Sequence, residues 1–218
     1  MVGETPRVVG TISTRAALEG TRDFPCDIVE VRLDKIGDAR HWLEGCEAIE
    51  HKGKPVLLTV RSAREGGDWR GSDDELRRLL LAALHRLAAV DIEMASPLAS
   101  EIAGEAARLG KGCVLSHHDF ARTPSAAEIE SIIARSEKLG GVTKIATMVN
   151  GEEDAARLRA LLRGPRGQPL CVIGMGASWT ALRVELGRLG SCLAYGYLDS
   201  SAAPGQLAAE ALMTALRG

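Results

Sequence analysis

One lysine of the chain occupies a position where a charged side chain is unexpected. Lys144 lies in the run Val142-Thr143-Lys144-Ile145-Ala146, whose composition is that of a buried strand. An ammonium group is costly there unless it is paired or neutralised. A lysine without solvation loses its proton more easily, and the free amine is a nucleophile toward carbonyl groups. The sequence therefore leaves two interpretations of Lys144: an imine-forming nucleophile, or an inward-facing cation paired with carboxylates.

Charged and polar side chains also end four other apolar runs. They are Glu30 and Arg32, Arg61 with the nearby Glu65, Asp91 and Glu93, and the pair His117 and His118. Each pair taken alone is typical of a structural ion pair, of solvated carboxylates or of a capping histidine. Five unrelated ion pairs at the ends of five consecutive runs would be a coincidence. The pattern as a whole therefore favours one shared site.

The same residues argue against a metal site. His117 and His118 are adjacent, so on a strand their side chains point to opposite faces and do not readily bind one ion together. No HxH or HExxH pattern is present. We therefore expect no metal.

The elements that must position these residues alternate along the whole chain. Short apolar runs cover residues 7–13, 27–33, 55–61, 89–94, 112–118, 142–148, 169–175 and 191–198, and helical spacing covers 73–87, 125–139, 152–162 and 204–216. Eight units in 218 residues, about 27 each, predict an α/β protein, a compact (β/α)8 TIM barrel that forms a single catalytic domain over residues 1–218. In such barrels the catalytic residues lie at the C-terminal ends of the strands. An open doubly wound sheet is the alternative, but its glycine-rich first turn is missing around Gly10 and Thr11.

Composition excludes several classes of function. The chain has 27 basic and 29 acidic residues and only 3% aromatic residues, so we expect no nucleic acid partner. The apolar stretch at 79–90 is interrupted by His85 and Arg86, and no signal peptide is apparent, so we expect no membrane partner. Five cysteines without a CxxC pair indicate reduced thiols and a cytoplasmic protein; they are Cys26, Cys46, Cys113, Cys171 and Cys192.

Six blocks in order resemble the type I 3-dehydroquinate dehydratases, Schiff-base enzymes of the shikimate pathway of aromatic amino acid biosynthesis. The blocks are residues 27–34, 59–67, 91–93, 116–120 followed by Thr123-Pro124, 144–146, and a closing set of Met175, Arg183, 190–191, 195–196 and 203–206. The resemblance covers nearly the whole chain. It implies a lyase that dehydrates the small molecule 3-dehydroquinate to 3-dehydroshikimate, without metal or cofactor, and it is compatible with a homodimer.

The resemblance also implies roles for individual residues. Lys144 forms the imine, His118 is the general acid and base, and Glu65 orients that histidine. The implied substrate-binding residues are Thr11, Glu30, Arg32 and Arg61 near the ring hydroxyls, Arg183 and Gln206 at the carboxylate, and Met175 and Ala202.

The chain departs from the family pattern at three places. Leu182 precedes Arg183 where the family often has serine, and Ala202 replaces another frequent serine, which removes one hydroxyl donor near the substrate. Residues 1–6 are too short for the N-terminal hairpin that closes the barrel in some relatives. The small residues of 202–206 predict a lid over the site, with a plain turn before the last helix as the alternative.

Two other functions remain open from the sequence. One is another Schiff-base barrel, such as a class I aldolase acting on a sugar phosphate, for which Gly174-Met175-Gly176 would be the phosphate site. The other is a non-catalytic, ligand-sensing barrel. Such a protein would be expected to lack Lys144 or His118, and this chain has both.

Overall fold

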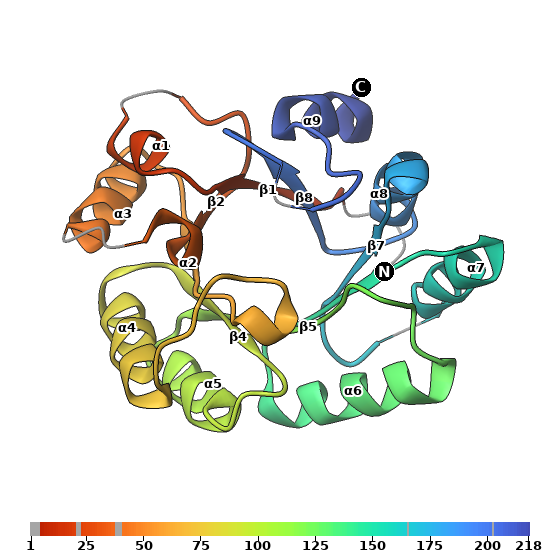
Figure 1. Ribbon diagram of the computed structural model, residues 1–218, viewed down its shortest axis with the longest axis horizontal. Coiled ribbons are helices and arrows are strands. Elements are labelled where there is room, and N and C mark those ends of the chain that lie inside the picture. The colour runs from red at the N-terminus through yellow and green to blue at the C-terminus, as the bar shows by residue number, and fades with distance from the viewer. Residues whose placement is uncertain (1–4, 21–22, 38–40, 165, 202) are drawn as a thin grey trace.

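Eight parallel strands form a nearly closed ring with helices around it (Figure 1). The computed structural model describes residues 5–20, 23–37, 41–164, 166–201 and 203–218. The strands are β1 (Arg7–Ile12), β2 (Ile28–Arg32), β3 (Val56–Thr59), β4 (Ala89–Glu93), β5 (Gly112–Asp119), β6 (Val142–Met148), β7 (Leu170–Met175) and β8 (Leu193–Tyr197). Their hydrogen-bonded order is β7-β6-β5-β4-β3-β2-β1-β8. The predicted (β/α)8 barrel is confirmed.

The helices follow the strands along the chain and lie outside the ring (Figure 1). They are α1 (Arg15–Glu19), α2 (Leu33–Ile36), α3 (Trp42–His51), α4 (Asp73–Arg86), α5 (Ala99–Arg108), α6 (Ala126–Leu139), α7 (Glu152–Leu161), α8 (Thr180–Arg188) and α9 (Ala209–Arg217), with short 3-10 turns at Ala63–Glu65 and Ala177–Trp179. Two of the helices begin with a capping box, in which Ser72 pairs with Glu75 and Ser125 with Glu128. These caps satisfy backbone N–H groups that a helix start leaves without partners.

The last helix begins later than its sequence pattern predicts. Helical spacing predicts a helix from residue 204, but α9 starts at Ala209. Gly205 has a positive φ of 71°, and Ala208 forms an isolated bridge with Tyr197 of β8. The chain therefore turns at Gly205 and stays extended through the bridge at Ala208 before the helix begins.

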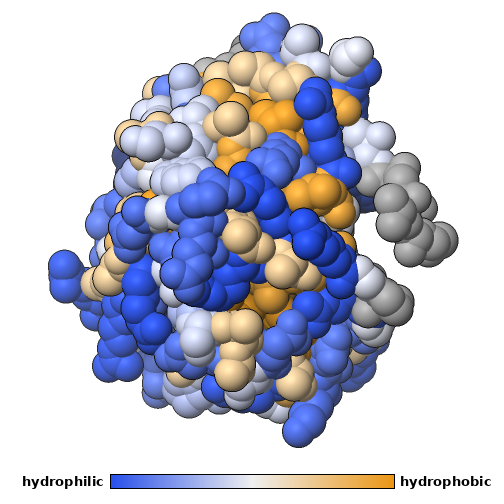
Figure 2. Space-filling model, turned by 90° about the vertical axis from the view of Figure 1, so that its right-hand side faces the viewer, coloured by the Kyte–Doolittle hydropathy of each residue, from blue (hydrophilic) through white to orange (hydrophobic). Residues whose placement is uncertain are grey.

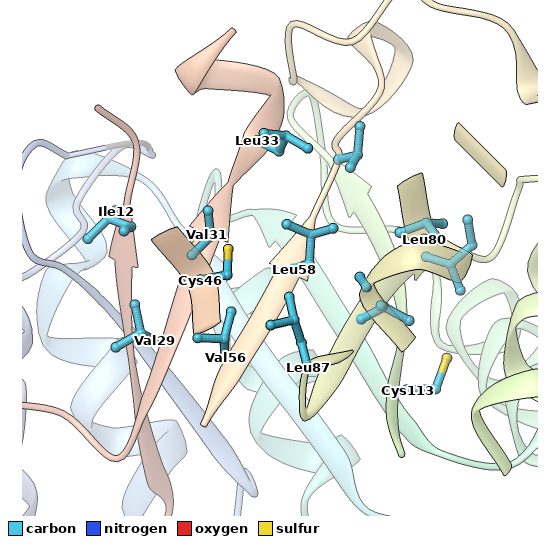
Figure 3. Close-up of a cluster of buried hydrophobic side chains, with 14 of the residues drawn as sticks. Ile12, Val29, Val31, Leu33, Cys46, Val56, Leu58, Leu80, Leu87 and Cys113 are labelled. Atoms are coloured by element: carbon cyan, nitrogen blue, oxygen red, sulfur yellow. The ribbon is translucent and has the colours of Figure 1, made fainter. Parts of the chain in front are cut away.

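Most of the hydrophobic core lies between the strands and the helices. Figure 3 shows part of it, where Val29 and Val31 of β2 and Val56 and Leu58 of β3 point toward the surrounding helices. Leu87, which follows α4, is fully buried in the same cluster. Burying a side chain of this size stabilises the fold by about 1.5–3 kcal/mol. The alternate residues of the same strands, such as Glu30, are thereby turned to the inside of the barrel.

A second, smaller apolar cluster fills the inside of the barrel below the polar residues. It consists of Val9, Leu57, Val114, Ala146, Cys171, Ile173, Met175, Leu193 and Tyr195. These side chains come from six different strands, as expected for the packed interior of a barrel. Several of these side chains, including Met175 and Tyr195, also line the cavity that holds the polar residues.

The ring closes between β7 and β8 without a regular ladder. The Cys192 N–H donates to the Leu170 carbonyl at 2.9 Å. The Ser191 hydroxyl accepts from the Val172 N–H at 3.0 Å and donates to the Leu193 carbonyl at 2.9 Å. This buried serine therefore supplies bonds that a neighbouring strand would otherwise make.

The face of the molecule that Figure 2 shows is largely hydrophilic. Figure 2, which faces the side of the molecule where α7 and α8 lie in Figure 1, shows charged side chains with smaller apolar areas between them. The five cysteines are free thiols. In the described part of the chain, no helix has the length and apolar character needed to cross a bilayer.

Candidate active site

One cavity at the C-terminal ends of the strands brings the predicted site residues together. Ten of the eleven line it: Thr11, Glu30, Arg32, Arg61, Glu65, His118, Lys144, Met175, Arg183 and Gln206. The eleventh, Ala202, lies outside the described residues. Gly66, Phe120, Ala146, Ile173, Tyr195 and Ala203 complete the lining. Residues spread over almost the whole sequence therefore share one site.

Lys144 reaches the cavity from the middle of β6 and is only 4% exposed. Its Nζ lies 3.4 Å from Asp91 Oδ2 and 3.9 Å from Glu30 Oε1. The same nitrogen lies 4.0 Å from the centroid of the Tyr195 ring. The amine is thus held between two carboxylates and an aromatic face. Both sequence interpretations of Lys144 fit this geometry, because a paired lysine in a cavity can also react there.

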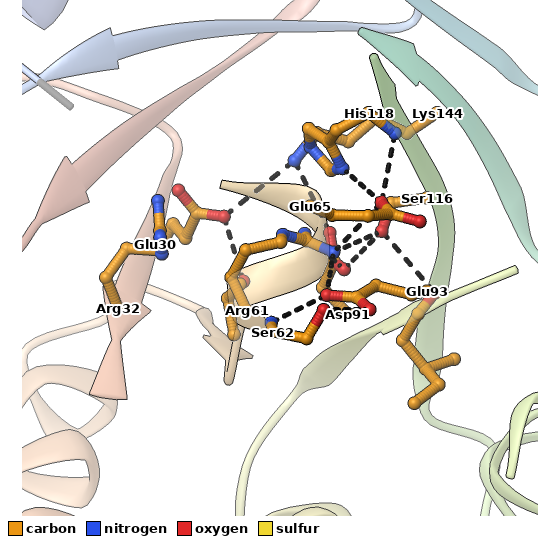
Figure 4. A network of polar contacts seen from close by, with 12 residues as sticks. Glu30, Arg32, Arg61, Ser62, Glu65, Asp91, Glu93, Ser116, His118 and Lys144 are labelled. Carbon is orange, nitrogen blue, oxygen red and sulfur yellow. Dashed lines mark hydrogen bonds and ion pairs between the residues drawn. The ribbon is translucent and has the colours of Figure 1, made fainter. Parts of the chain in front are cut away.

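Asp91 and Arg61 form the centre of a buried polar network (Figure 4). Arg61 Nη2 donates to Asp91 Oδ1 at 2.6 Å, and Nη1 donates to the Ser116 hydroxyl at 2.8 Å. Ser116 in turn donates to Asp91 Oδ1 at 2.6 Å. Burial alone would raise the pKa of Asp91, but the Arg61 and Lys144 cations outweigh it and hold that pKa below its usual range. Asp91 is therefore a fixed anion that anchors both cations.

Two further pairs organise the β2 side of the cavity. Glu30 accepts hydrogen bonds from Thr11 Oγ1 and Thr59 Oγ1, each at 2.8 Å. Arg32 donates to Asp34 through Nε at 2.9 Å and Nη2 at 2.8 Å. Burial would lower the pKa of Arg32, but the Asp34 hydrogen bonds raise it above its usual value. These contacts leave Glu30 and Arg32 with fixed positions on the cavity wall.

His118 is bound to Glu65 at the other side. Glu65 Oε2 accepts from the His118 backbone N–H at 3.0 Å and lies 2.9 Å from His118 Nδ1. Burial lowers the pKa of His118 well below 6.5, and the Arg61, Lys144 and Arg32 cations lower it further. Burial also raises the pKa of Glu65 to about 8, against the opposing charge of Arg61. Near neutrality the imidazole is therefore uncharged and can accept a proton.

The strand register separates the two adjacent histidines. Ser116 of β5 pairs with Lys144 of β6, so these two side chains share the inner face. His118, two residues beyond Ser116, lies on that face too, whereas His117 points the other way. His117 does not line the cavity, and its buried Nε2 has no hydrogen-bond partner among the described residues.

Hydrogen bonds from Ser62 to Glu93 fix the turn that holds Glu65. Glu93 Oε1 accepts from the Ser62 backbone N–H, and Oε2 accepts from the Ser62 hydroxyl, both at 2.7 Å. Gly66 follows with a φ of 78°, and a Cβ at this glycine would lie 2.3 Å from the Phe120 ring. Only glycine meets both demands, the left-handed backbone and the close ring. The shape of this loop therefore requires glycine at position 66.

Arg183 reaches the cavity from α8, not from a strand end. It is 7% exposed, its Nη2 donates to the Pro204 carbonyl at 3.1 Å, and its Nε has no hydrogen-bond partner among the described residues. No carboxylate in the described part of the chain pairs with it. Burial lowers the pKa of Arg183 to about 10, so the guanidinium stays charged at neutral pH. A buried cation of this kind is suited to an anionic ligand.

Sequence reasoning assigned no role to several residues of the site. Asp91 and Glu93 enter the sequence pattern only as charged strand ends, and Ser116 and Tyr195 only as members of the family motifs. The alternation of Asp91 and Glu93 along β4 was an available signal, because it places both on the inner face with Glu30 and Arg32. Tyr195 offered no such signal, since an aromatic residue in a strand is ordinary core.

The family model of the type I 3-dehydroquinases matches residues 11–218. A curated 3-dehydroquinate dehydratase of Methanocella arvoryzae is 32% identical over 97% of this chain and 96% of that protein. The Methanothrix thermoacetophila 3-dehydroquinate dehydratase is 33% identical over 98% of this chain and 92% of that protein.

Solved structures give the same result. The type I 3-dehydroquinate dehydratase of Clostridium difficile, described with covalently modified comenic acid, has a TM-score of 0.87 and 26% identity over 99% of this chain and 92% of its own. The 3-dehydroquinate dehydratase of Enterococcus faecalis has a TM-score of 0.84 and 26% identity over 100% of this chain and 95% of its own. These matches confirm the enzyme class that the sequence predicted. The chain belongs to the type I 3-dehydroquinase family.

Proposed function

We propose that this chain removes water from 3-dehydroquinate to give 3-dehydroshikimate, through an imine on Lys144 and proton transfer by His118, as a single catalytic domain of the cytoplasm. Family membership supports the reaction. The observation that supports the mechanism is the position of Lys144, a buried amine on the inner face of the barrel beside the neutral imidazole of His118.

The first step joins Lys144 to the substrate. The Nζ lone pair attacks the C3 ketone, and the carbinolamine loses water to give an iminium cation. Proton loss at C2 then leaves an electron pair that the iminium accepts, so that a neutral enamine forms instead of a carbanion. The carboxylates of Asp91 and Glu30 lie close enough to stabilise the positive charge on the nitrogen.

His118 transfers the proton. Its imidazole takes the C2 proton and later gives a proton to the C1 hydroxyl, which leaves as water while the enamine returns to an iminium. Water then hydrolyses the iminium and releases 3-dehydroshikimate and the free amine of Lys144. One group can serve both steps because the pKa of His118 is low enough to leave it neutral at the start. Acid and base help of this kind contributes about 10²–10⁴ in rate.

The remaining cavity residues bind the substrate. We assign its carboxylate to Arg183, whose buried charge and whose Nε, without a hydrogen-bond partner among the described residues, suit a planar anion, with Gln206 beside it. We assign its ring hydroxyls to Thr11, Glu30, Arg32 and Arg61, and its apolar ring edge to Met175, all of which line the cavity. The covalently modified ligand described for the Clostridium difficile relative supports covalent chemistry in this family.

Borohydride reduction tests the mechanism. We expect sodium borohydride with 3-dehydroquinate to inactivate the enzyme and to leave a stable adduct on the peptide that contains Lys144, located by mass spectrometry. Lys144→Ala should abolish turnover while substrate binding remains measurable by calorimetry. A sugar phosphate in place of 3-dehydroquinate should give no adduct. An adduct on another lysine, or normal turnover by Lys144→Ala, would refute the mechanism.

A further inference from the structure

Tyr195 makes a contact across the barrel that the proposed reaction does not yet use. It lies on β8, whereas Lys144 lies on β6, and β7 stands between them in the chain. The ring of Tyr195 is 6% exposed, and its centroid lies 4.0 Å from Lys144 Nζ. The two side chains therefore meet inside the ring of strands.

The phenol hydroxyl contributes little to this contact. It is buried and has no hydrogen-bond partner among the described residues. Burial raises the pKa of Tyr195 well above its ordinary value of 10, and the Glu30 carboxylate raises it further. The hydroxyl therefore stays neutral and cannot balance the charge of Lys144 as a phenolate. What Tyr195 presents to the nitrogen is the face of its ring.

An aromatic face attracts a cation through its quadrupole, and most strongly where water is excluded. This matters because the hydrogen bonds of the nitrogen change during the reaction. The ammonium of Lys144 has three protons for Asp91 and Glu30, but an iminium nitrogen has only one. It can no longer donate to both carboxylates, whereas the ring attracts positive charge without needing an N–H bond.

We propose that Tyr195 is a positioning residue for Lys144, whose ring face holds the nitrogen in place and stabilises its cationic forms, the ammonium and then the iminium. This inference rests on the proposed function. It assigns the effect to the aromatic ring of Tyr195 and not to its hydroxyl.

A graded substitution series separates the ring face from size and shape. Tyr195→Phe keeps the ring and removes the hydroxyl. Phenylalanines with one, three and five fluorines, introduced at position 195 by codon suppression, keep nearly the same shape while the negative face weakens and finally reverses. Tyr195→Leu removes the face altogether. Unfolding midpoints in urea, measured for every variant, show which proteins remain folded.

The first measurement is made without substrate. Cyanate carbamoylates only neutral amines, so the labelling rate of Lys144, followed by peptide mass spectrometry at one neutral pH, reports how strongly the ammonium is stabilised. We expect Tyr195→Phe to stay within about twofold of the wild type. The rate should rise with each added fluorine, to about tenfold for the pentafluoro variant, as expected for a buried cation–π contact. The exposed Lys138 serves as the internal control and should not change.

The second measurement adds 3-dehydroquinate and borohydride. The fraction of enzyme trapped at Lys144 in the steady state should fall along the same fluorine series, and kcat should fall with it, while Tyr195→Phe stays near the wild type. A flat fluorine series in both measurements would overturn the inference. The inference would also be overturned if Tyr195→Phe behaved like Tyr195→Leu, because the hydroxyl would then be the group that acts on Lys144.

The two proposals fail in different ways. If the wild type gives no adduct on Lys144, the imine mechanism is wrong, although a graded cyanate series would still support the contact with the ammonium. If the wild type is trapped at Lys144 and the fluorine series is flat, the imine mechanism holds and the role of Tyr195 is refuted.

Discussion

A single oxygen of Glu65, Oε2, contacts two nitrogens of one residue, His118: it accepts from the backbone N–H at 3.0 Å and lies 2.9 Å from Nδ1. The backbone group can only donate, so Oε2 acts there as an acceptor. The same oxygen can accept from Nδ1 only if Nδ1 holds the proton of the neutral imidazole. The charged form of Glu65 can only accept, so it selects the tautomer in which Nε2 is the proton acceptor. The two contacts also fix the ring against its own backbone.

His118→Ala should lower kcat at least about a hundredfold, because proton transfer is lost. The variant keeps Lys144 and should still form the imine, so a covalent adduct should accumulate and be visible by mass spectrometry. His117→Ala is the matched control, since His117 lies on the outer face of the same strand. It should keep most of its kcat. The opposite result, an inactive His117→Ala and a nearly normal His118→Ala, would mean that the assignment is shifted by one residue.

The ionisation of Glu65 should be visible at His118. Because the pKa of Glu65 is raised to about 8, its carboxyl is protonated below that pH and becomes charged above it. We expect the ¹⁵N signals of the His118 imidazole to show an inflection near pH 8. Glu65→Gln keeps an oxygen that accepts both hydrogen bonds but cannot ionise, so the inflection should vanish and activity at pH 7 should fall by no more than about tenfold. An inflection that persists in Glu65→Gln would assign it to another group.

The low pKa of His118 sets the acid side of the rate profile. A base whose pKa lies well below 6.5 stays unprotonated as the pH falls through that value, so kcat/KM should begin to fall only in more acidic solution. Titration of kcat/KM between pH 4 and pH 8 checks this, with His117→Ala expected to follow the wild-type curve. A limb centred at or above 6.5 would contradict the burial of a neutral imidazole.

Arg183→Ala should raise KM about 10- to 100-fold, the effect of losing hydrogen bonds to a charged group, with a smaller change in kcat. Arg183→Lys should recover only part of this loss, because an ammonium cannot present two parallel donors. Arg188→Ala, on the same helix but exposed and bonded to the Ala215 carbonyl, is the control and should bind normally. If KM is unchanged in Arg183→Ala, the carboxylate is bound elsewhere.

Ser191→Ala should destabilise the closure of the ring between β7 and β8. The substitution leaves the buried Val172 N–H without its 3.0 Å partner, which costs about 1–3 kcal/mol of unfolding free energy. Urea denaturation measures the change. The exposed Ser131→Ala should stay within about 0.5 kcal/mol of the wild type. Equal stability of both variants would show that the closure between β7 and β8 does not depend on the Ser191 hydroxyl.

Local sequence patterns determined the elements and the inner faces of the strands. Eight apolar runs and the helical spacing between them were enough to predict the barrel. The period of two placed Glu30 with Arg32, and Asp91 with Glu93, on one side of each strand. The predicted start of the last helix was wrong. Pro204 and Gly205 fit the first turn of a helix by residue type, but a long-range bridge between Ala208 and Tyr197 keeps the chain extended up to Ala209.

The sequence by itself also determined the family and the group of residues that share the cavity, because motifs in a fixed order identify both. Only the tertiary structure decided which residues touch. Asp91 meets Lys144, and Tyr195 faces the same nitrogen, although none of these three lies on neighbouring strands. Contacts across a barrel depend on how the twisted sheet closes and how far each side chain reaches. Strand periodicity states only that a side chain points inward, so it cannot state what that side chain meets.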